Sequence, residues 1–294
     1  MRETARRDLN LTAAALALHT SQPGLSKAIR EFEEELGVTI FVRHGKRLTQ
    51  VTDAGRQVLA IVDRILLEID NLKRTSTEWR DAEAGELRIA ATHTQARYSL
   101  PPAIAALRLQ YPQVVVRLHQ GNPTQIVEML RGGQADIGIA TEAIGAQSDL
   151  DSEALFCWYH CAIAQASHPL ARFERVTLEQ LAEHDLITYD PEFAGRGRID
   201  QAFATRTLRP RIVLEATDSD VIKTYVRLGL GVGIVSELAL GPSADGSVDG
   251  LRADSGLVTL PIGRPFERNL TRAAWLAGRM LRGYERSLIE GLKR

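Results

Sequence analysis

Residues 10–37 read NLTAAALALHTSQPGLSKAIREFEEELG, and this stretch decides the fold of the amino-terminal part of the chain. Asn10 can cap a first helix that is rich in alanine and leucine. Thr20 or Ser21 can cap a second helix, and Pro23 is tolerated in its first turn. Two short helices joined by a tight polar turn are typical of a helix-turn-helix.

The second helix has one apolar stripe and one polar face. Its apolar residues recur at steps of four and three, and Gly37 is suited to end it in the left-handed conformation. In a helix-turn-helix, the start of this helix meets base edges in the major groove. The alternative is an ordinary helical hairpin with a solvated face. The predicted DNA contacts are Thr20, Ser21, Gln22, Pro23, Ser26, Lys27 and Arg30.

A basic turn follows this helix. Residues 38–42 and 48–51 read as two short strands, and glycine lies in the turn between them. Such a hairpin is typical of the wing of a winged helix, whose cations hold phosphates without reading sequence. A solvated basic turn is the alternative. The formal net charge of -1 does not indicate a nucleic-acid binder, but a local cluster matters more. The predicted phosphate contacts are Arg43, Lys46 and Arg47.

A long helix is predicted from Thr52 or Asp53 to about residue 80. Its apolar residues repeat in a heptad pattern, which suits packing against a second copy of the same helix. Packing on its own domain is the alternative. A self-paired helix makes the protein a dimer that reads a two-fold-related DNA site. The predicted dimer seam consists of Val58, Val62, Ile65, Ile69 and Leu72.

Strands and helices alternate over the rest of the chain, which predicts an α/β fold with a largely parallel sheet. Two such units joined by crossing strands resemble a periplasmic binding protein that holds its ligand between two lobes. A last helix is expected over residues 270–292. The expected organisation is a winged helix-turn-helix over 1–52, a linker helix over 53–80, and an effector-binding domain over 86–294, with lobe I at about 86–161 and 265–294 and lobe II at about 162–264.

Hydroxyl groups follow two of the predicted strands of the first lobe. Residues 92–97 read THTQAR between a strand and a helix, and Thr141 follows another strand. Backbone N–H groups at the start of a helix favour an anion, and threonine hydroxyls add neutral donors. The alternative is that these hydroxyls only cap helices.

The composition argues against several other classes of protein. Hydrophobic residues make up 44% and charged residues 25% of the 294 residues, as in an ordinary globular protein. The chain lacks a membrane-length apolar run and a secretory signal, so we expect a cytoplasmic protein without a membrane partner. Two cysteines and scattered histidines show no metal-ligand spacing, and no catalytic motif appears. We therefore expect no enzyme, metal or cofactor.

The helix-turn-helix region resembles the signature of LysR-type transcriptional regulators. This family places a full helix before the motif, and only its second half appears at residues 1–5, so we expect the true start to lie upstream of Met1. The resemblance implies a homotetramer built as a dimer of dimers, bound to promoter DNA and in contact with RNA polymerase. It is carried by Ala14-Ala15, Leu18, Ser21-Gln22-Pro23, Leu25-Ser26, Ile29, Phe32-Glu33, Leu36-Gly37, Ile40-Phe41 and Arg43.

The second part of the chain resembles the CysB subgroup of that family. The matching blocks are residues 92–98, 121–126, 139–143 and 216–233. The resemblance implies control of sulfur assimilation and cysteine biosynthesis, with sulfate, acetylserine or adenosine phosphosulfate as the effector. It carries the effector contacts to Thr92, Thr94, Gln95 and Thr141.

One family contact is missing. The family has a threonine in a Gly-Phe-Thr-Gly-Arg segment, where this chain has Ala194 within EFAGR. Alanine donates no hydrogen bond, so either Arg196 compensates or the second lobe prefers another ligand, with a solvated role for Arg196 as the alternative. The competing functions are a solute-binding protein for a small anion, a LysR-type regulator with an effector unrelated to sulfur, and an enzyme of cysteine synthesis.

Overall fold

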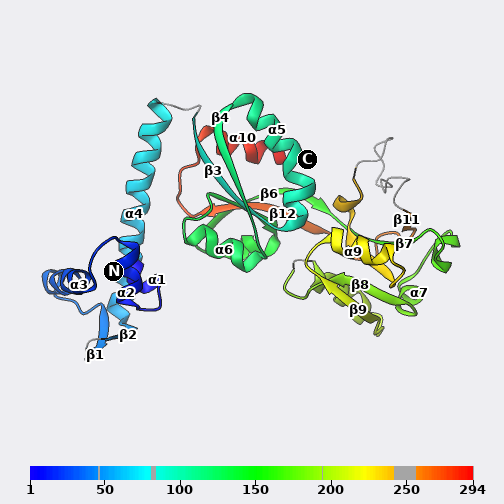
Figure 1. Cartoon of the computed structure of the whole chain (residues 1–294), viewed down its shortest axis with the longest axis horizontal. Coiled ribbons are helices and arrows are strands. Elements are labelled where there is room, and N and C mark those ends of the chain that lie inside the picture. The colour runs from blue at the N-terminus through cyan, green and yellow to red at the C-terminus, as the bar shows by residue number, and fades with distance from the viewer. Residues whose placement is uncertain (46, 81–83, 194, 242–255, 294) are drawn as a thin grey trace. The chain divides into compact units, whose positions relative to one another are not determined.

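The computed structural model describes residues 1–45, 47–80, 84–193, 195–241 and 256–293 (Figure 1). Within them the chain forms two compact units, Met1–Thr77 and Glu78–Arg294. Two residues predicted to bind ligands, Lys46 and Ala194, lie outside the described residues. No helix in the described ranges combines the length and apolar character needed to cross a membrane.

The first unit contains the predicted helix-turn-helix. Asn10 accepts a hydrogen bond from the backbone of Ala13, and Ser21 rather than Thr20 caps the second helix. Gly37 ends that helix with a φ of 65°, as expected. The elements are α1 (Arg2–Arg6), α2 (Leu11–Ala17), α3 (Gln22–Leu36), β1 (Phe41–His44), β2 (Arg47–Val51) and α4 (Asp53–Arg80).

The core of this unit is small. Leu25 and Ile29 of α3 pack against Ala14 of α2 and Phe41 of β1, whereas Leu36, expected on the same stripe, is exposed. Strands β1 and β2 pair antiparallel and form the predicted wing. The first strand begins at Phe41 instead of residue 38, because a side chain of α3 binds the backbone that precedes the wing.

That side chain is Glu33. Its Oε1 accepts hydrogen bonds from the backbone N–H groups of Ile40 and Phe41 at 2.8 and 2.9 Å. Its Oε2 lies 3.1 Å from Nη2 of Arg43. Burial opposes the charge of Glu33, but the bonds from Phe41 and Arg43 outweigh it and lower the pKa of this carboxyl. Arg43, predicted to hold phosphates, is therefore engaged in joining the wing to α3.

Thr52, one of the two predicted caps, directly precedes the long helix α4 and caps its first turn. The Thr52 hydroxyl accepts from the backbone of Gly55 at 2.8 Å and donates to the Thr39 carbonyl at 2.6 Å. Val58, predicted to start the dimer seam, packs instead on the core of its own unit. This difference arises because the first turns of α4 complete that small core. Beyond it α4 leaves an exposed apolar stripe, made of Ile61, Ile65, Ile69 and Leu72, with Val62 half-buried beside it.

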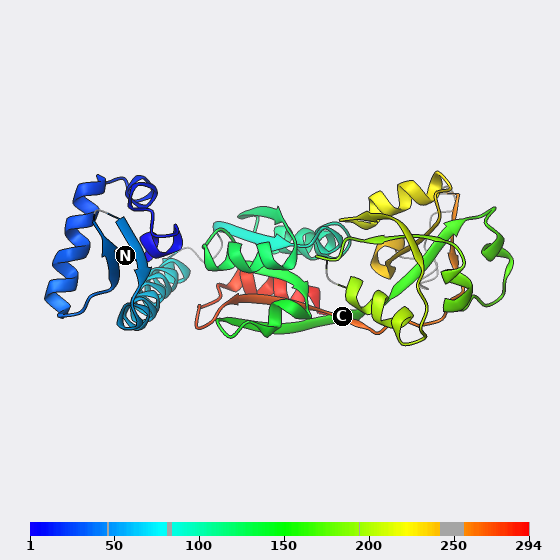
Figure 2. The ribbon, with the colours of Figure 1, turned by 90° about the horizontal axis from the view of Figure 1, so that it is seen from below.

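The second unit consists of two lobes, each with a five-stranded sheet (Figure 1). In lobe I the order is β4-β3-β5-β12-β6, with α5 and α10 packed in one core and α6 in another. Both views show the carboxyl-terminal helix α10, in red, within lobe I (Figure 2). The elements are β3 (Ala84–Ala91), α5 (Leu100–Gln110), β4 (Gln113–Gln120), α6 (Pro123–Arg131), β5 (Ile137–Thr141), β6 (Leu150–Trp158), β12 (Asn269–Leu276) and α10 (Gly283–Leu292).

Lobe II has the strand order β11-β7-β10-β8-β9, with α9 packed on β7, β8 and β10. In each lobe three strands run parallel, as predicted, and the other two are antiparallel to their neighbours. The antiparallel strands are those by which the chain passes between the lobes. The elements are β7 (His160–Gln165), α7 (Leu178–Ala182), β8 (Asp185–Tyr189), α8 (Arg196–Ala204), β9 (Arg211–Ala216), α9 (Ser219–Arg227), β10 (Val232–Ser236) and β11 (Leu257–Leu260).

Two boundaries differ from the sequence analysis. The first passage between the lobes lies at Tyr159, because β6 ends at Trp158 and β7 starts at His160. The helix expected over residues 270–292 is wrong in its first half, which forms β12, and only Gly283–Leu292 is helical. β12 lies between β5 and β6, so several of its residues are buried, and its short apolar run lacks the alternation that marks an exposed strand.

Replacing Glu33 by alanine is expected to destabilise the wing by about 2 kcal/mol, since two buried N–H groups lose their acceptor. Hydrogen exchange of the Ile40 and Phe41 amides in the full chain measures this loss. The matched control is Glu35→Ala, an exposed residue of the same helix.

The effect depends on pH. Because the folded pKa of Glu33 is lowered, its stabilisation is complete above the ordinary value of 4.5 and is lost as the pH falls through the folded pKa. The wing of Glu33→Gln should lack this acid sensitivity. Equal exchange rates of the Ile40 and Phe41 amides in Glu33→Ala and Glu35→Ala would refute the role of Glu33 in stabilising the wing.

Candidate functional site

Three of the predicted effector-binding residues meet at one edge of the lobe I sheet. Thr92 directly follows β3, Thr141 ends β5, and Gln95 begins the short helical turn Gln95–Ser99 that leads into α5. All three are buried, with 8%, 5% and 1% of their surface exposed. This is the carboxyl edge of parallel strands, where α/β sheets bind ligands.

A residue that the sequence analysis missed joins them. Thr271 of β12 is fully buried and pairs with Thr141 across the sheet. Its Oγ1 accepts hydrogen bonds from Nε2 of Gln95 at 3.0 Å and from Nε1 of Trp158 at 3.1 Å. Since a hydroxyl carries two acceptor positions and one proton, the proton of Thr271 remains to be donated. Thr271 was missed because its segment was expected to be helical.

Gln95 has one unused end. Its Oε1 is buried and accepts no hydrogen bond from any residue that the structure describes. A buried polar atom without a partner is costly, so such an atom often marks a place where a ligand binds. A rotation of the amide by 180° exchanges its oxygen for N–H₂, so this side chain can serve either an acceptor or a donor of the ligand.

Thr94 faces the other lobe. Its hydroxyl lies near the phenol of Tyr189, the last residue of β8. The Tyr189 hydroxyl lies 2.6 Å from Oγ of Ser219 and accepts from the backbone N–H of Ser236 at 2.8 Å. Burial raises the pKa of Tyr189 above its ordinary value, so the phenol stays neutral. Tyr189 and Ser236 both end strands, a signal that the sequence analysis applied only to lobe I.

Arg196 has a structural environment in lobe II. The side chain is buried, which rules out the solvated role considered as its alternative. Its Nε donates to Asp200 at 2.8 Å, and its Nη1 donates to Glu215 at 2.7 Å and to the Tyr189 carbonyl. These bonds connect α8 with β8 and β9, so the donors that they use are not available to replace the missing threonine hydroxyl.

Charged side chains connect the lobes beside this site. The Tyr98 hydroxyl of lobe I donates to Oδ1 of Asp220 in lobe II at 2.6 Å and accepts from Nζ of Lys223 at 2.7 Å. Nζ of Lys223 also lies 2.9 Å from Oδ1 of Asp220, and Nε of Arg97 lies 2.5 Å from Oδ2 of Asp220. Burial opposes the charge of Asp220, but the bonds from Tyr98 and Lys223 outweigh it and lower its pKa. We call Arg97, Tyr98, Asp220 and Lys223 the clasp.

The first unit presents the predicted DNA-contacting residues of α3 on one polar face. Leu25 and Ile29 are buried, so the remaining face of the helix is turned outward. Ser21 also caps α3, and Lys27 lies 3.5 Å from Glu31 in an exposed ion pair. Of the predicted contacts, the exposed ones are Thr20, Ser21, Pro23, Lys27, Arg30 and Arg47, and the half-buried ones are Gln22, Ser26 and Arg43.

Two family models match this chain. The model described as a bacterial regulatory helix-turn-helix protein of the lysR family covers residues 3–56, and the LysR substrate binding domain covers residues 80–294. The first of these spans α1 to the start of α4, and the second spans both lobes.

Several curated proteins resemble the chain over nearly its whole length. It is 52% identical to the HTH-type transcriptional regulator CysB of Burkholderia cenocepacia over 99% of this chain and 90% of that protein. It is 44% identical to the regulator SsuR of the same species, over 99% of this chain and 91% of that protein. It is 43% identical to the regulator cbl of Escherichia coli, over 99% of this chain and 89% of that protein.

Solved structures agree with the two-lobed fold. The cofactor-binding domain of the Cbl transcriptional regulator is 41% identical and superposes with a TM-score of 0.65 over 71% of this chain and 88% of that chain. Full-length OxyR from Pseudomonas aeruginosa, at 21% identity, has a TM-score of 0.70 over 99% of this chain and 94% of that one. At that identity the second likeness shows the fold alone.

Removal of the Tyr98 hydroxyl tests the clasp. In Tyr98→Phe, Asp220 and Lys223 lose a partner that joins them to lobe I. This loss should destabilise the contact between the two lobes by about 2 kcal/mol. Hydrogen exchange over residues 218–223 should rise in the full chain. The control is Tyr225→Phe, on the same helix as Asp220 and Lys223 but outside the clasp. Unchanged exchange in Tyr98→Phe would contradict a stabilising role for this contact.

Proposed function

Because the chain belongs to the LysR family of transcriptional regulators, we propose that it controls genes of sulfur assimilation and cysteine biosynthesis in response to a small sulfur-related effector. The effector class is sulfate, acetylserine or adenosine phosphosulfate, bound between the lobes. The proposal is supported by identities of 43–52% to regulators named CysB, SsuR and cbl. In this proposal the protein acts in the cytoplasm, on promoter DNA.

The observation that carries the proposal is the set of neutral polar groups at the edge of the lobe I sheet. Thr92, Thr141 and Thr271 lie at this edge, and the Thr271 hydroxyl contacts Gln95 in the helical segment that starts there. Neutral donors and the amino terminus of a helix can hold an anion without a full counter-charge. A binding site of this kind suits sulfate, and it also suits the carboxylate of acetylserine.

Ala194 supports a narrower alternative. The sequence has no hydroxyl at this position, and the buried Arg196 is bonded to protein groups. Lobe II of this chain then offers an anion fewer hydrogen-bond donors than lobe II of the CysB subgroup does. A LysR-type regulator whose effector is not a sulfur compound is the second candidate, and the choice of ligand separates the two.

The DNA-binding half of the proposal rests on the apolar stripe of α4. Ile61, Ile65, Ile69 and Leu72 are 47%, 53%, 44% and 72% exposed, and they repeat at steps of four, four and three. Such a stripe suits burial against a copy of the same helix. We propose a dimer through α4 and a tetramer made of two such dimers, which contacts RNA polymerase. The effector acts by favouring one arrangement of the lobes and hence one spacing of the DNA-reading helices.

The solute-binding protein and the enzyme are disfavoured as functions. A solute-binding protein has no use for the helix-turn-helix and its wing, which match a DNA-binding family model. The relatives at 43–52% identity are named as regulators, not as enzymes of cysteine synthesis.

Truncation of Gln95 should weaken effector binding. Calorimetry of the full chain with sulfate, acetylserine and adenosine phosphosulfate identifies the ligand. Gln95→Ala should then lower its affinity about 10- to 100-fold, since a buried polar contact is worth about 1–3 kcal/mol. The matched control is Gln201→Ala, an exposed residue of α8. Equal affinity in both variants contradicts the assigned site, and failure of all three compounds to bind favours the effector unrelated to sulfur.

Charges placed on the α4 stripe should separate the dimer. The double variant Ile65→Asp, Ile69→Asp is expected to sediment as a smaller oligomer than the original chain. Its affinity for promoter DNA should fall as well, because each helix-turn-helix loses the second one to which dimerisation joins it. Phe173→Asp, a change of an exposed residue in lobe II, is the control. A double variant that sediments like the original chain would refute dimerisation through this stripe.

A further inference from the structure

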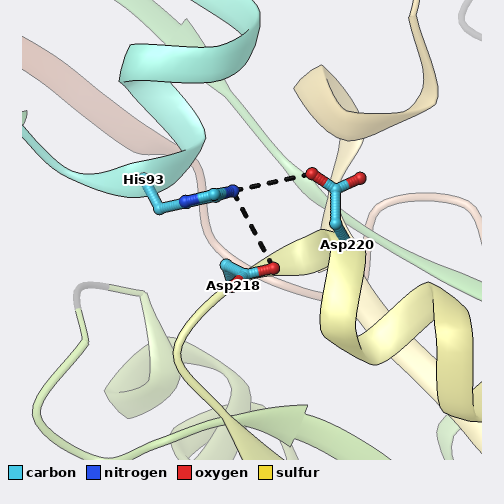
Figure 3. A group of neighbouring side chains, drawn as sticks. All are labelled: His93, Asp218 and Asp220. Carbon is cyan, nitrogen blue, oxygen red and sulfur yellow. Dashed lines mark ion pairs between the residues drawn. The ribbon is translucent and has the colours of Figure 1, made fainter. Parts of the chain in front are cut away.

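Three side chains of kinds that can bind a metal ion converge from the two lobes, and one of them, Asp220, also belongs to the clasp (Figure 3). His93 follows β3 in lobe I, whereas Asp218 and Asp220 lie at the start of α9 in lobe II. Nε2 of His93 is 3.5 Å from Oδ2 of Asp220 and 3.9 Å from Oδ1 of Asp218. One ligand atom from each residue lies within 4.8 Å of the other two.

The orientation of the imidazole is fixed by Gln120. Nδ1 of His93 lies 3.2 Å from Oε1 of Gln120, at the end of β4. A carbonyl oxygen only accepts, so Nδ1 is the donor in this contact and Nε2 is left to face the other lobe. Nε2 points toward the two carboxylates, with which it forms ion pairs when it carries a proton. Nε2 is buried and has no hydrogen-bond partner among the residues that the structure describes.

Two carboxylates facing Nε2 require a positive charge between them, which is either a proton on Nε2 or a bound cation in its place. Lys223 and Tyr98 already bind Oδ1 of Asp220, and Arg97 binds its Oδ2. Arg97 is 58% exposed, so its side chain can move into solvent when a stronger cation arrives. Asp218 accepts the backbone N–H of Val221 at 2.9 Å and keeps further lone pairs. In the part of the chain that the structure describes, neither Lys223 nor Arg97 hydrogen-bonds to Nε2 of His93.

We propose that His93, Asp218 and Asp220 form a zinc site that bridges the two lobes. Imidazole and carboxylate ligands suit zinc, which binds them at about 2.0–2.2 Å in a tetrahedron with ligand atoms about 3.4 Å apart. The observed 3.5 and 3.9 Å are close to this spacing. Water supplies the fourth position. The contact of Gln120 with the far nitrogen is the outer-shell bond that metal-bound histidines usually make.

The ion is a second ligand of the sensor, distinct from the proposed effector. Its ligands come from both lobes, so a bound ion holds them at the spacing seen here, as the clasp does. It uses none of Gln95, Thr141 and Thr271. The zinc site can therefore be present or absent whatever the effector proves to be.

Zinc titration of the metal-free full chain by calorimetry tests the site. We expect one zinc per chain at this site, and an affinity at least about 100-fold lower in His93→Gln and in Asp218→Asn. An asparagine side chain can still cap α9, so Asp218→Asn keeps the helix. Gln120→Ala should weaken binding by about tenfold. The control is His184→Gln, which removes one member of a histidine pair away from this site, His168 and His184, whose rings lie 4.8 Å apart.

Three results would overturn the proposal. The first is that the original chain binds no zinc, and the second is that His93→Gln binds zinc as tightly as the original chain. The third is that the control variant loses as much zinc affinity as His93→Gln. X-ray absorption of the zinc-loaded chain adds a direct readout. A shell of nitrogen and oxygen atoms with one imidazole is expected, whereas sulfur ligation would move the ion to Cys157 or Cys161 and contradict the assignment.

Discussion

The hydrogen bonds of Tyr98 with Asp220 and Lys223 are the constraint on which the sensor depends. They join the segment that leads into α5 in lobe I to the start of α9 in lobe II. Lys223 is buried, and its charge is satisfied by Tyr98, Asp220 and the carbonyl of Ala239. Opening of the lobes breaks a bond to a buried ammonium group, so closure is favoured by more than apolar contact. A ligand that prefers the closed lobes gains from an arrangement that the chain already stabilises.

Much of this architecture could be predicted from local sequence. Asn10, Ser21 and Gly37 carry cap and stop signals that depend only on near neighbours, so the helix-turn-helix follows from them. Thr92 and Thr141 are predicted because polar residues at the ends of parallel strands meet at one edge of a sheet, whereas Gln95 follows from the resemblance to the CysB subgroup. That rule needs only the alternation of strands and helices, which the sequence of lobe I displays.

The remaining residues depend on contacts distant in sequence. Thr271 lies in a strand whose partners, β5 and β6, come much earlier in the chain, and its short apolar run is ambiguous between helix and strand. Glu33 and Arg43 look like members of an acidic run and a basic turn until the fold pairs them. His93 has no ligand spacing in sequence, because Asp218 and Asp220 belong to the other lobe. Arg196 looks exposed, yet its fold neighbours bury it.

The proposed sensing mechanism requires that an anionic effector bind where Gln95, Thr141 and Thr271 meet. A crystal structure of the full chain with the effector identified by calorimetry would show whether it does. We predict ligand density in contact with the Thr271 hydroxyl and the Gln95 amide, with the Tyr98–Asp220 bond intact. Density confined to another surface, with the polar groups of Gln95 and Thr271 unchanged, would contradict this mechanism.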